Sequence, residues 1–367
     1  MSRLRIVVVL ALLVFGLSAL SVAAAPAPDG DVAAPVAYDV TPRPAPASYF
    51  IGQLKHSVQT LNNCGPASVV SAMSFYDIDV SQEAARQVLR PYAESRGMSQ
   101  HVIPPYVAKF GLQAKVRLNG NDDLIKALVA NDIPVIVLQY VSETWRIGHF
   151  RVVQGYDDRA GVFYANDSLL GPNVAISYRS FDARWDYNWS YYVPIYRPDQ
   201  APLVAAVLGP DWTDKGMYDR TIPSLQAKLA TNPTDWRTWS RLVEAMTGAE
   251  RYQEALDHLD YYTALRGASA ESGFGSPSNN GAPSNTSATR IKLLNKLERY
   301  DEALTEVNAA LAKSRNGQYG SGSLWLQKAE ALRGLGRNEE ARAAYQRAIA
   351  NDGPMSEAGQ RLQTLPR

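Results

Sequence analysis

The sequence predicts an α+β domain followed by an all-α solenoid. Between residues 48 and 198, amphipathic helical segments come first and short apolar strands follow, the order typical of an α+β domain. From about residue 223 the hydrophobic pattern is purely helical. In that half one phrase occurs three times, as Arg251-Tyr-Gln-Glu-Ala-Leu256, Arg299-Tyr-Asp-Glu-Ala-Leu304 and Arg337-Asn-Glu-Glu-Ala-Arg342.

Residues 1–25 have the features of an export signal peptide. Arg3 and Arg5 precede an apolar run from residue 6 to 20, and small residues follow up to Ala25. The run is shorter than a typical membrane span, and an uncleaved anchor is the competing interpretation. We therefore expect an exported protein, extracellular or in the cell envelope, that contacts a membrane only if this segment is an uncleaved anchor.

Residues 26–47 are rich in Ala and Pro and predict an extended linker rather than a fold.

The composition excludes several classes of function. The net charge is +1 and no Lys/Arg-rich run occurs, so we expect no nucleic-acid partner. The chain has one cysteine, which excludes an intrachain disulfide and a cysteine-based zinc site, and we expect no metal or cofactor.

The elements of the domain at residues 48–198 follow from periodicity and from turn signals. A helix is expected after Cys64, a second over residues 82–89 with Ser81 as its cap, and a third over residues 124–130 after Asp122 and Asp123. Four strands are then expected, over residues 134–140, 149–154, 161–165 and 191–195.

Two further regions complete the predicted organisation. Residues 199–222 contain Gly209-Pro210 and are expected to connect two separately folding halves. Residues 223–367 carry the repeats, interrupted by a Gly/Ser/Asn-rich loop over residues 267–288. The last repeat resembles a tetratricopeptide repeat, with small and aromatic residues at the expected offsets, namely Trp325, Ala329, Leu332, Gly336, Ala341, Tyr345 and Ala348.

Cys64 is the strongest candidate for a reactive residue. It stands in Gln59-Thr-Leu-Asn-Asn-Cys64-Gly65-Pro66, directly before the apolar stripe of a helix. Gly65 and Pro66 cannot extend that helix backwards, so Cys64 is expected at its N-terminus. Unpaired N–H groups and the positive end of the helix dipole favour a thiolate there.

A cysteine nucleophile needs a base, a group that orients the base, and donors for an oxyanion. His149 opens a strand and is the candidate base, whereas the other three histidines lie in polar or repeat segments. Asp167 ends the next strand and is the candidate orienting group, with Asn166 as its local rival. Gln59 can donate its side-chain N–H beside the backbone N–H of Cys64.

These segments resemble the bacteriocin-processing-type, double-glycine leader peptidase-like cysteine peptidases, which are papain-like. The resemblance covers roughly residues 50–197 and rests on Gln-x4-Cys-Gly-Pro-Ala-Ser, Gly-His-Phe-Arg-Val-Val-Gln-Gly-Tyr-Asp and Asn-Asp-Ser. It implies Cys64 as nucleophile, His149 as base, Asp167 as orienting acid and Gln59 as oxyanion donor. Two departures are that no transporter segments occur and that Ser168 stands where many relatives have proline.

The expected function is that of an exported thiol-dependent peptidase acting on a peptide or protein. The repeats are expected to bind the substrate or a partner protein. The alternatives are a papain-like docking module without turnover, and amidase or transpeptidase chemistry on the same residues. A cell-wall hydrolase would predict a wall-binding module, and none is recognisable in the sequence.

Overall fold

A computed structural model describes seven ranges of the chain, namely 40–91, 97–185, 189–233, 235–266, 285–313, 321–352 and 357–366. The expected signal peptide, most of the Ala/Pro-rich linker and most of the loop expected over residues 267–288 lie outside these ranges. Within them, no helix combines the length and the apolar character that crossing a membrane requires.

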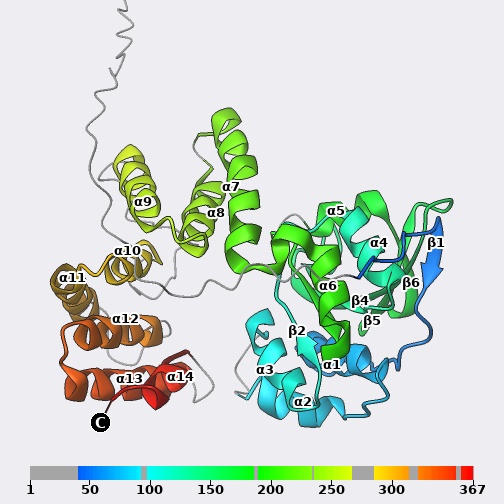
Figure 1. Ribbon diagram of the computed structural model, residues 1–367, viewed down its shortest axis with the longest axis horizontal. Coiled ribbons are helices and arrows are strands. Elements are labelled where there is room, and N and C mark those ends of the chain that lie inside the picture. The colour runs from blue at the N-terminus through cyan, green and yellow to red at the C-terminus, as the bar shows by residue number, and fades with distance from the viewer. Residues whose placement is uncertain are drawn as a thin grey trace, which may run out of the picture. The chain divides into compact units, whose positions relative to one another are not determined.

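The N-terminal domain is built on one antiparallel sheet (Figure 1). The strand order is β2–β7–β3–β4–β5–β6, and β1 pairs with β4. The four strands expected from the sequence are present as β3, β4, β5 and β7, and three further strands join them. The strands are β1 (Ser48–Phe50), β2 (Gln113–Ala114), β3 (Val135–Tyr140), β4 (Gly148–Asp157), β5 (Val162–Asp167), β6 (Gly171–Ser177) and β7 (Tyr192–Tyr196).

Helices cover both faces of this sheet. Alternation along the strands sends Ile136 and Val152 into one core and Val135 and Val153 into the other. The first core is shared with helices α1 (Cys64–Ser74), α2 (Gln82–Leu89) and α3 (Ile103–Ala108). The second is shared with helices α4 (Asp122–Ala130), α5 (Tyr178–Trp185) and α6 (Ala201–Leu208).

Two helix starts can be compared with the expected caps. Ser81 caps α2 as expected, since its hydroxyl accepts a hydrogen bond from the Ala84 N–H. Helix α4 begins two residues earlier than expected, and its cap is Asn121, which accepts from Leu124 N at 2.9 Å. Asp122 and Asp123 therefore lie inside the first turn, where the helix dipole favours acidic side chains.

Residues 199–222, expected as a connector, are helical in the structure. They form α6, two short 3-10 helices (Pro198–Gln200 and Gly209–Trp212) and the first half of α7 (Asp214–Thr231). Val204 and Leu208 of α6 are buried in the same core as α4 and α5. The N-terminal domain therefore extends beyond Pro198, and α6 is one of its core helices.

The C-terminal half consists of helices that pack against their neighbours in the chain. This confirms the predicted fold class, an α+β domain followed by an all-α repeat region. The helices after α7 are α8 (Trp236–Gly248), α9 (Tyr252–Arg266), α10 (Asn285–Lys296), α11 (Tyr300–Lys313), α12 (Ser321–Gly334), α13 (Asn338–Asp352) and α14 (Glu357–Gln363).

The recurring phrase marks the start of every second helix, and its residues have the same contacts in each copy. The arginine precedes the helix, its carbonyl accepts from the alanine N–H, and its guanidinium pairs with the glutamate three residues later. The alanines are fully buried, which lets paired helices approach closely. The positions concerned are Arg251, Glu254 and Ala255; Arg299, Glu302 and Ala303; and Arg337, Glu340 and Ala341.

The turn before each phrase has a left-handed residue. Gly336 has φ of +73°, and Glu250 and Glu298 at the equivalent positions have φ of +63° and +58°. Glycine adopts this conformation freely, whereas the two glutamates are held there by the tight turn between paired helices. The repeats therefore share one backbone turn as well as one sequence phrase.

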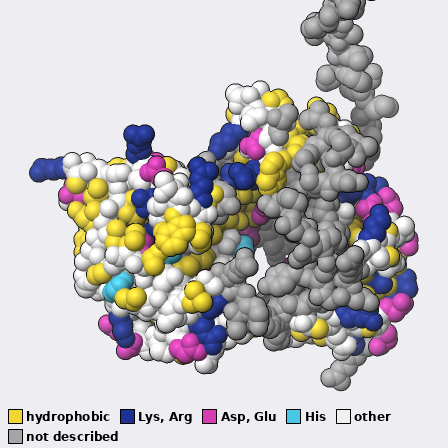
Figure 2. All heavy atoms as spheres, turned by 180° about the vertical axis from the view of Figure 1, so that it is seen from behind, with side chains coloured by type: hydrophobic (Ala, Val, Ile, Leu, Met, Phe, Trp, Pro, Cys, Tyr) yellow, Lys and Arg dark blue, Asp and Glu magenta, His cyan; other side chains and the backbone are white. Residues whose placement is uncertain are grey.

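Figure 2 shows one face of the molecule. Lysine and arginine side chains are interspersed there with aspartate and glutamate, in keeping with the small net charge of +1. Hydrophobic side chains also gather on this face. Such gathered apolar surface is a feature of binding sites more often than of plain solvent-facing surface.

The helical nature of residues 199–222 yields a prediction about truncation. A chain ending at Pro198 should be less stable than one ending at Arg220, because it lacks Val204 and Leu208. Burial of two such side chains is worth about 3–6 kcal/mol. Urea unfolding followed by tryptophan fluorescence would measure the difference. Equal unfolding midpoints for the two truncations would contradict the inclusion of α6 in this domain.

Candidate active site

Cys64 is the first residue of α1, as the sequence predicts. A Cβ at position 65 would lie 2.6 Å from Met98 Cε, so glycine is what lets this turn approach Met98. Pro66 is buried in the first turn, where the absence of an N–H breaks no helical hydrogen bond. The Cys-Gly-Pro order thus starts the helix at the thiol.

His149 lies near the start of β4 and is 2% exposed. Its Nε2 is 2.9 Å from Asp167 Oδ1. Because Nε2 faces the carboxylate, Nδ1 is the ring nitrogen left for the Cys64 thiol, with which His149 shares a hydrogen bond. The structure therefore brings Cys64, His149 and Asp167 into one connected row.

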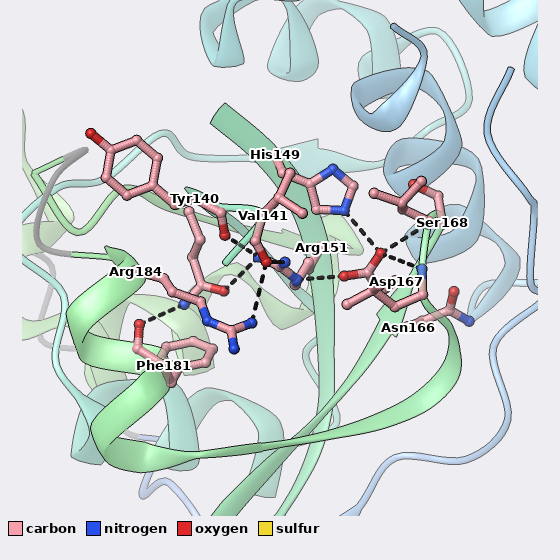
Figure 3. A network of polar contacts seen from close by, with 12 residues as sticks. Tyr140, Val141, His149, Arg151, Asn166, Asp167, Ser168, Phe181 and Arg184 are labelled. Atoms are coloured by element: carbon pink, nitrogen blue, oxygen red, sulfur yellow. Dashed lines mark hydrogen bonds and ion pairs between the residues drawn. The ribbon is translucent and has the colours of Figure 1, made fainter. Parts of the chain in front are cut away.

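Asp167 ends β5 and is fully buried. Besides facing His149, its Oδ1 accepts from the backbone N–H groups of Leu169 at 2.8 Å and Leu170 at 3.0 Å. The turn after β5 therefore holds the carboxylate against the imidazole. Figure 3 shows Asp167 between His149 on one side and Arg151 on the other.

The three groups shift one another's ionisation. Burial opposes ionisation of the thiol, yet the hydrogen bond with His149 and its charge bring the pKa of Cys64 below its ordinary value. Burial also opposes protonation of the imidazole, yet the hydrogen bonds with Asp167 and Cys64 raise the pKa of His149. Burial disfavours the charged carboxylate, but His149 and Arg151 hold the pKa of Asp167 well below its usual range. These directions favour a thiolate–imidazolium pair.

Gln59 is held by Ser168, the residue next to Asp167. The backbone N–H of Gln59 donates to the backbone carbonyl of Ser168, and the Ser168 hydroxyl donates to the side-chain oxygen of Gln59, Oε1. Both distances are 2.9 Å. With its oxygen occupied in this way, the amide of Gln59 has its two N–H donors left for other partners. Ser168 is buried, so this pairing joins the loop before Cys64 to the end of β5.

The other candidate residues lie outside this row. Asn166 faces away from Asp167, with its Oδ1 3.0 Å from His56 Nδ1. His101 stacks edge-on against Tyr191, with 6.3 Å between the ring centroids. His258 packs against a tryptophan in the repeats, Trp239, with 5.6 Å between centroids. His149 is therefore the histidine that the fold places beside Cys64.

Arg151 was missed by the sequence analysis. It is fully buried, and its Nε donates to Asp167 Oδ2 at 2.5 Å. Alternation along β4 puts it on the same face as His149. In the β4–β5 pairing, Val152 lies opposite Asn166, so one step further Arg151 faces Asp167. A charged residue two positions after His149 in an otherwise apolar strand was the signal that could have revealed it.

Exposed apolar side chains flank the catalytic candidates on three loops. Leu61, which is 84% exposed, precedes Cys64 by three residues. The others are Val58, Trp145, Ile147, Leu169 and Leu170. Among the described residues, no cluster of three or more His, Cys, Asp or Glu side chains is arranged to hold a metal ion.

Comparisons with known proteins found one family model and several solved structures that match parts of the chain. Residues 49–193 match the model of the Peptidase_C39 like family. No curated protein matches the chain. Among solved structures, the chain is similar to the peptidase domain of Streptococcus ComA, a bi-functional ABC transporter involved in quorum sensing. The identity is 19% and the TM-score 0.33, over 40% of this chain and 98% of that one.

Two other solved structures are similar to parts of the chain. A double glycine motif protease from an AMS/PCAT transporter, in complex with the leader peptide, is 24% identical with a TM-score of 0.30, over 40% of this chain and 94% of that one. YrrB, a TPR protein with an unusual peptide-binding site, is 18% identical with a TM-score of 0.27, over 45% of this chain and 72% of that one. The residues that match the Peptidase_C39 like family, 49–193, include Cys64, His149 and Asp167.

Proposed function

We propose that the N-terminal domain is a thiol-dependent peptidase with Cys64 as its nucleophile. The observation that supports this most directly is the connected row of Cys64, His149 and Asp167, whose pKa directions all favour a thiolate beside an imidazolium. A structural cysteine needs no such base and no buried carboxylate behind it. Gln59 completes the set as an oxyanion donor.

In the proposed reaction, the Cys64 thiolate attacks the carbonyl carbon of an amide and forms an S–C bond. The oxyanion accepts hydrogen bonds from the Gln59 side chain and the Cys64 backbone N–H. The His149 imidazolium gives its proton to the departing amine as the C–N bond breaks, leaving an acyl-enzyme. His149 then takes a proton from water as the water oxygen bonds to the acyl carbon. The S–C bond breaks, which releases the acid and regenerates the Cys64 thiolate beside the His149 imidazolium.

The side chains around the site support a peptide with apolar residues near the bond that is cut. Trp145 and Ile147 precede His149, whereas Leu169 and Leu170 follow Asp167, and all four are exposed. Covering these side chains with apolar residues of a substrate removes both surfaces from water. We include this preference in the proposal.

Export and recruitment are further parts of the proposal. The Arg-containing, apolar N-terminal 25 residues support export to the envelope or the medium. In the repeats the small residues of the recurring phrase are buried, as Ala255, Ala303 and Ala341 show, so polar residues remain to bind a substrate or a partner protein.

Two alternatives use the same residues. A docking module without turnover would retain the fold but would not require the low pKa of a thiolate–imidazolium pair. An amidase or transpeptidase would form the same acyl-enzyme and differ in the group that accepts the acyl chain. Product masses separate hydrolysis from transpeptidation, because hydrolysis adds one water to the acyl fragment.

The reactivity of the thiol provides the first test. Iodoacetamide should alkylate Cys64 at pH values below those of an ordinary cysteine, whose pKa is about 8.5, because His149 stabilises the thiolate. The chain has a single cysteine, so all label reports this site. The rate is measured against pH for the wild type and for His149→Ala, whose titration should move up. A wild-type titration near the ordinary value would favour the docking module.

Turnover provides the second test. Digestion of a peptide library should stop with Cys64→Ala and with His149→Ala, with losses of about 10³-fold or more. Asp167→Ala should lose less than either, because water can partly orient the imidazole. His56→Ala, His101→Ala and His258→Ala are matched controls and should keep most activity. Activity that survives His149→Ala but not His101→Ala would show that the base is misassigned.

The oxyanion donor provides the third test. Gln59→Ala should lower kcat by about 10²–10³-fold. Ser168→Ala should lower kcat by a smaller factor of about 10, since the amide of Gln59 is then free to turn. Ser168→Thr keeps the hydroxyl and is the control that should retain kcat. If Gln59→Ala instead raises KM and leaves kcat unchanged, Gln59 acts in substrate binding.

A further inference from the structure

Arg151 is the one member of the catalytic network for which the proposed reaction has no use. All of its described contacts are with groups that carry negative charge or partial negative charge. Nε donates to Asp167 Oδ2 at 2.5 Å and Nη2 donates to the Val141 carbonyl at 2.6 Å. Nη1 donates to the Tyr140 carbonyl at 2.9 Å and to Gln139 Oε1 at 3.1 Å. A buried guanidinium with this set of partners is held in one position.

The carboxylate of Asp167 is divided between two cations. Oδ1 faces His149 and the two backbone N–H groups of the following turn, whereas Oδ2 faces Arg151. Both oxygens are therefore engaged in directed bonds, and the carboxylate cannot rotate without breaking one set. Arg151 thereby limits the orientations that Asp167 can offer to the imidazole.

Arg151 also acts on His149 through its charge. The charged and titratable groups around His149 are Cys64 on α1, Asp167 on β5 and Arg151 on β4, with Arg184 of α5 acting on Arg151. Asp167 and Cys64 favour the protonated imidazole and raise the pKa of His149, whereas the positive charge of Arg151 opposes protonation and offsets part of that rise. A base that keeps its proton too firmly is a poor acid toward a leaving amine.

We propose that Arg151 is a positioning residue that fixes the Asp167 carboxylate against His149 and limits how firmly that carboxylate retains the imidazolium proton. This rests on the proposed function, because the proton matters only if His149 must deliver it. Arg151 also fixes the carbonyls of Tyr140 and Val141 at the end of β3. The loop that begins there carries the exposed Trp145, so the same guanidinium connects that loop to the catalytic row.

The charge effect can be measured without a peptide substrate. Iodoacetate is an anion, so its reaction with the Cys64 thiolate is fastest while His149 is protonated, and the rate falls at high pH as the imidazolium loses its proton. Removal of the positive charge in Arg151→Gln should move this falling limb to higher pH, by about one unit. Arg151→Lys keeps a positive charge and should leave the limb near its wild-type position.

A matched control is available in Arg117. This arginine is also buried, pairs with Asp214 and donates to the carbonyls of Val116 and Trp212, but it does not belong to the catalytic network. Arg117→Gln should lower the unfolding temperature in the same way as Arg151→Gln while leaving the iodoacetate limb in place. A thermal melt of each variant identifies those that are folded.

The outcomes separate this inference from the proposed function. An upward shift in Arg151→Gln, absent from Arg151→Lys and Arg117→Gln, supports the limit that the Arg151 charge sets on proton retention by His149, even if no peptide is ever cleaved. A wild-type limb in folded Arg151→Gln overturns it and leaves Arg151 with a structural role alone, whether or not peptides are cleaved. If Arg151→Gln does not fold, Arg151→Lys provides the test. A falling limb at its wild-type pH in Arg151→Lys supports the inference. A limb raised by about one pH unit overturns it, because the positive charge has been kept.

Discussion

The row of Cys64, His149 and Asp167 depends on the hydrogen bonds and ion pairs of one buried carboxylate, that of Asp167. An ionised carboxylate without water must be surrounded by donors, and Asp167 has donors from β4 and from the turn after β5. Those donors include the two cations that hold its pKa low, His149 and Arg151. Because the same carboxylate raises the pKa of His149 and His149 lowers that of Cys64, the ionisation of the thiol depends on a residue that it does not contact.

The fold brings these groups together with one sheet and one helix. Strand β4 lies between β3 and β5, which allows Arg151 to reach the carbonyls at the end of β3 and the carboxylate at the end of β5. Helix α1 packs on the core that includes Phe150 and Val152, so its N-terminal Cys64 lies beside His149. Phe150 and Val152 thus face the core that β4 shares with α1, whereas His149 and Arg151, at alternate positions, form the polar row.

Much of this could be predicted from local sequence, and the rest required contacts that are distant in the chain. Cys64, His149 and Asp167 stand beside clear element boundaries, and their neighbours in the sequence place them at a helix start and at strand ends. Arg151 looked like an ordinary polar residue in a strand, because its partners lie ten residues or more away. Residues 199–222 were expected as a connector because of their Pro and Gly, yet Pro202 lies in the first turn of α6 and Gly209 ends it with φ of +54°. Proline and glycine interrupt a helix when they lie in its interior, but they are common in its first turn and just after its last residue, respectively.

The donors that face both oxygens of Asp167 also explain why position 167 holds a carboxylate, because the amide of asparagine could not accept all of these hydrogen bonds. Every group that faces the two carboxylate oxygens is a donor, from His149, Arg151, Leu169 and Leu170. Asparagine has one acceptor oxygen and one N–H₂ group, so either orientation would set donors against donors at one side. The amide would also carry no charge to balance the buried guanidinium of Arg151. A site with histidine alone as partner could use either residue, whereas the presence of Arg151 makes the carboxylate necessary.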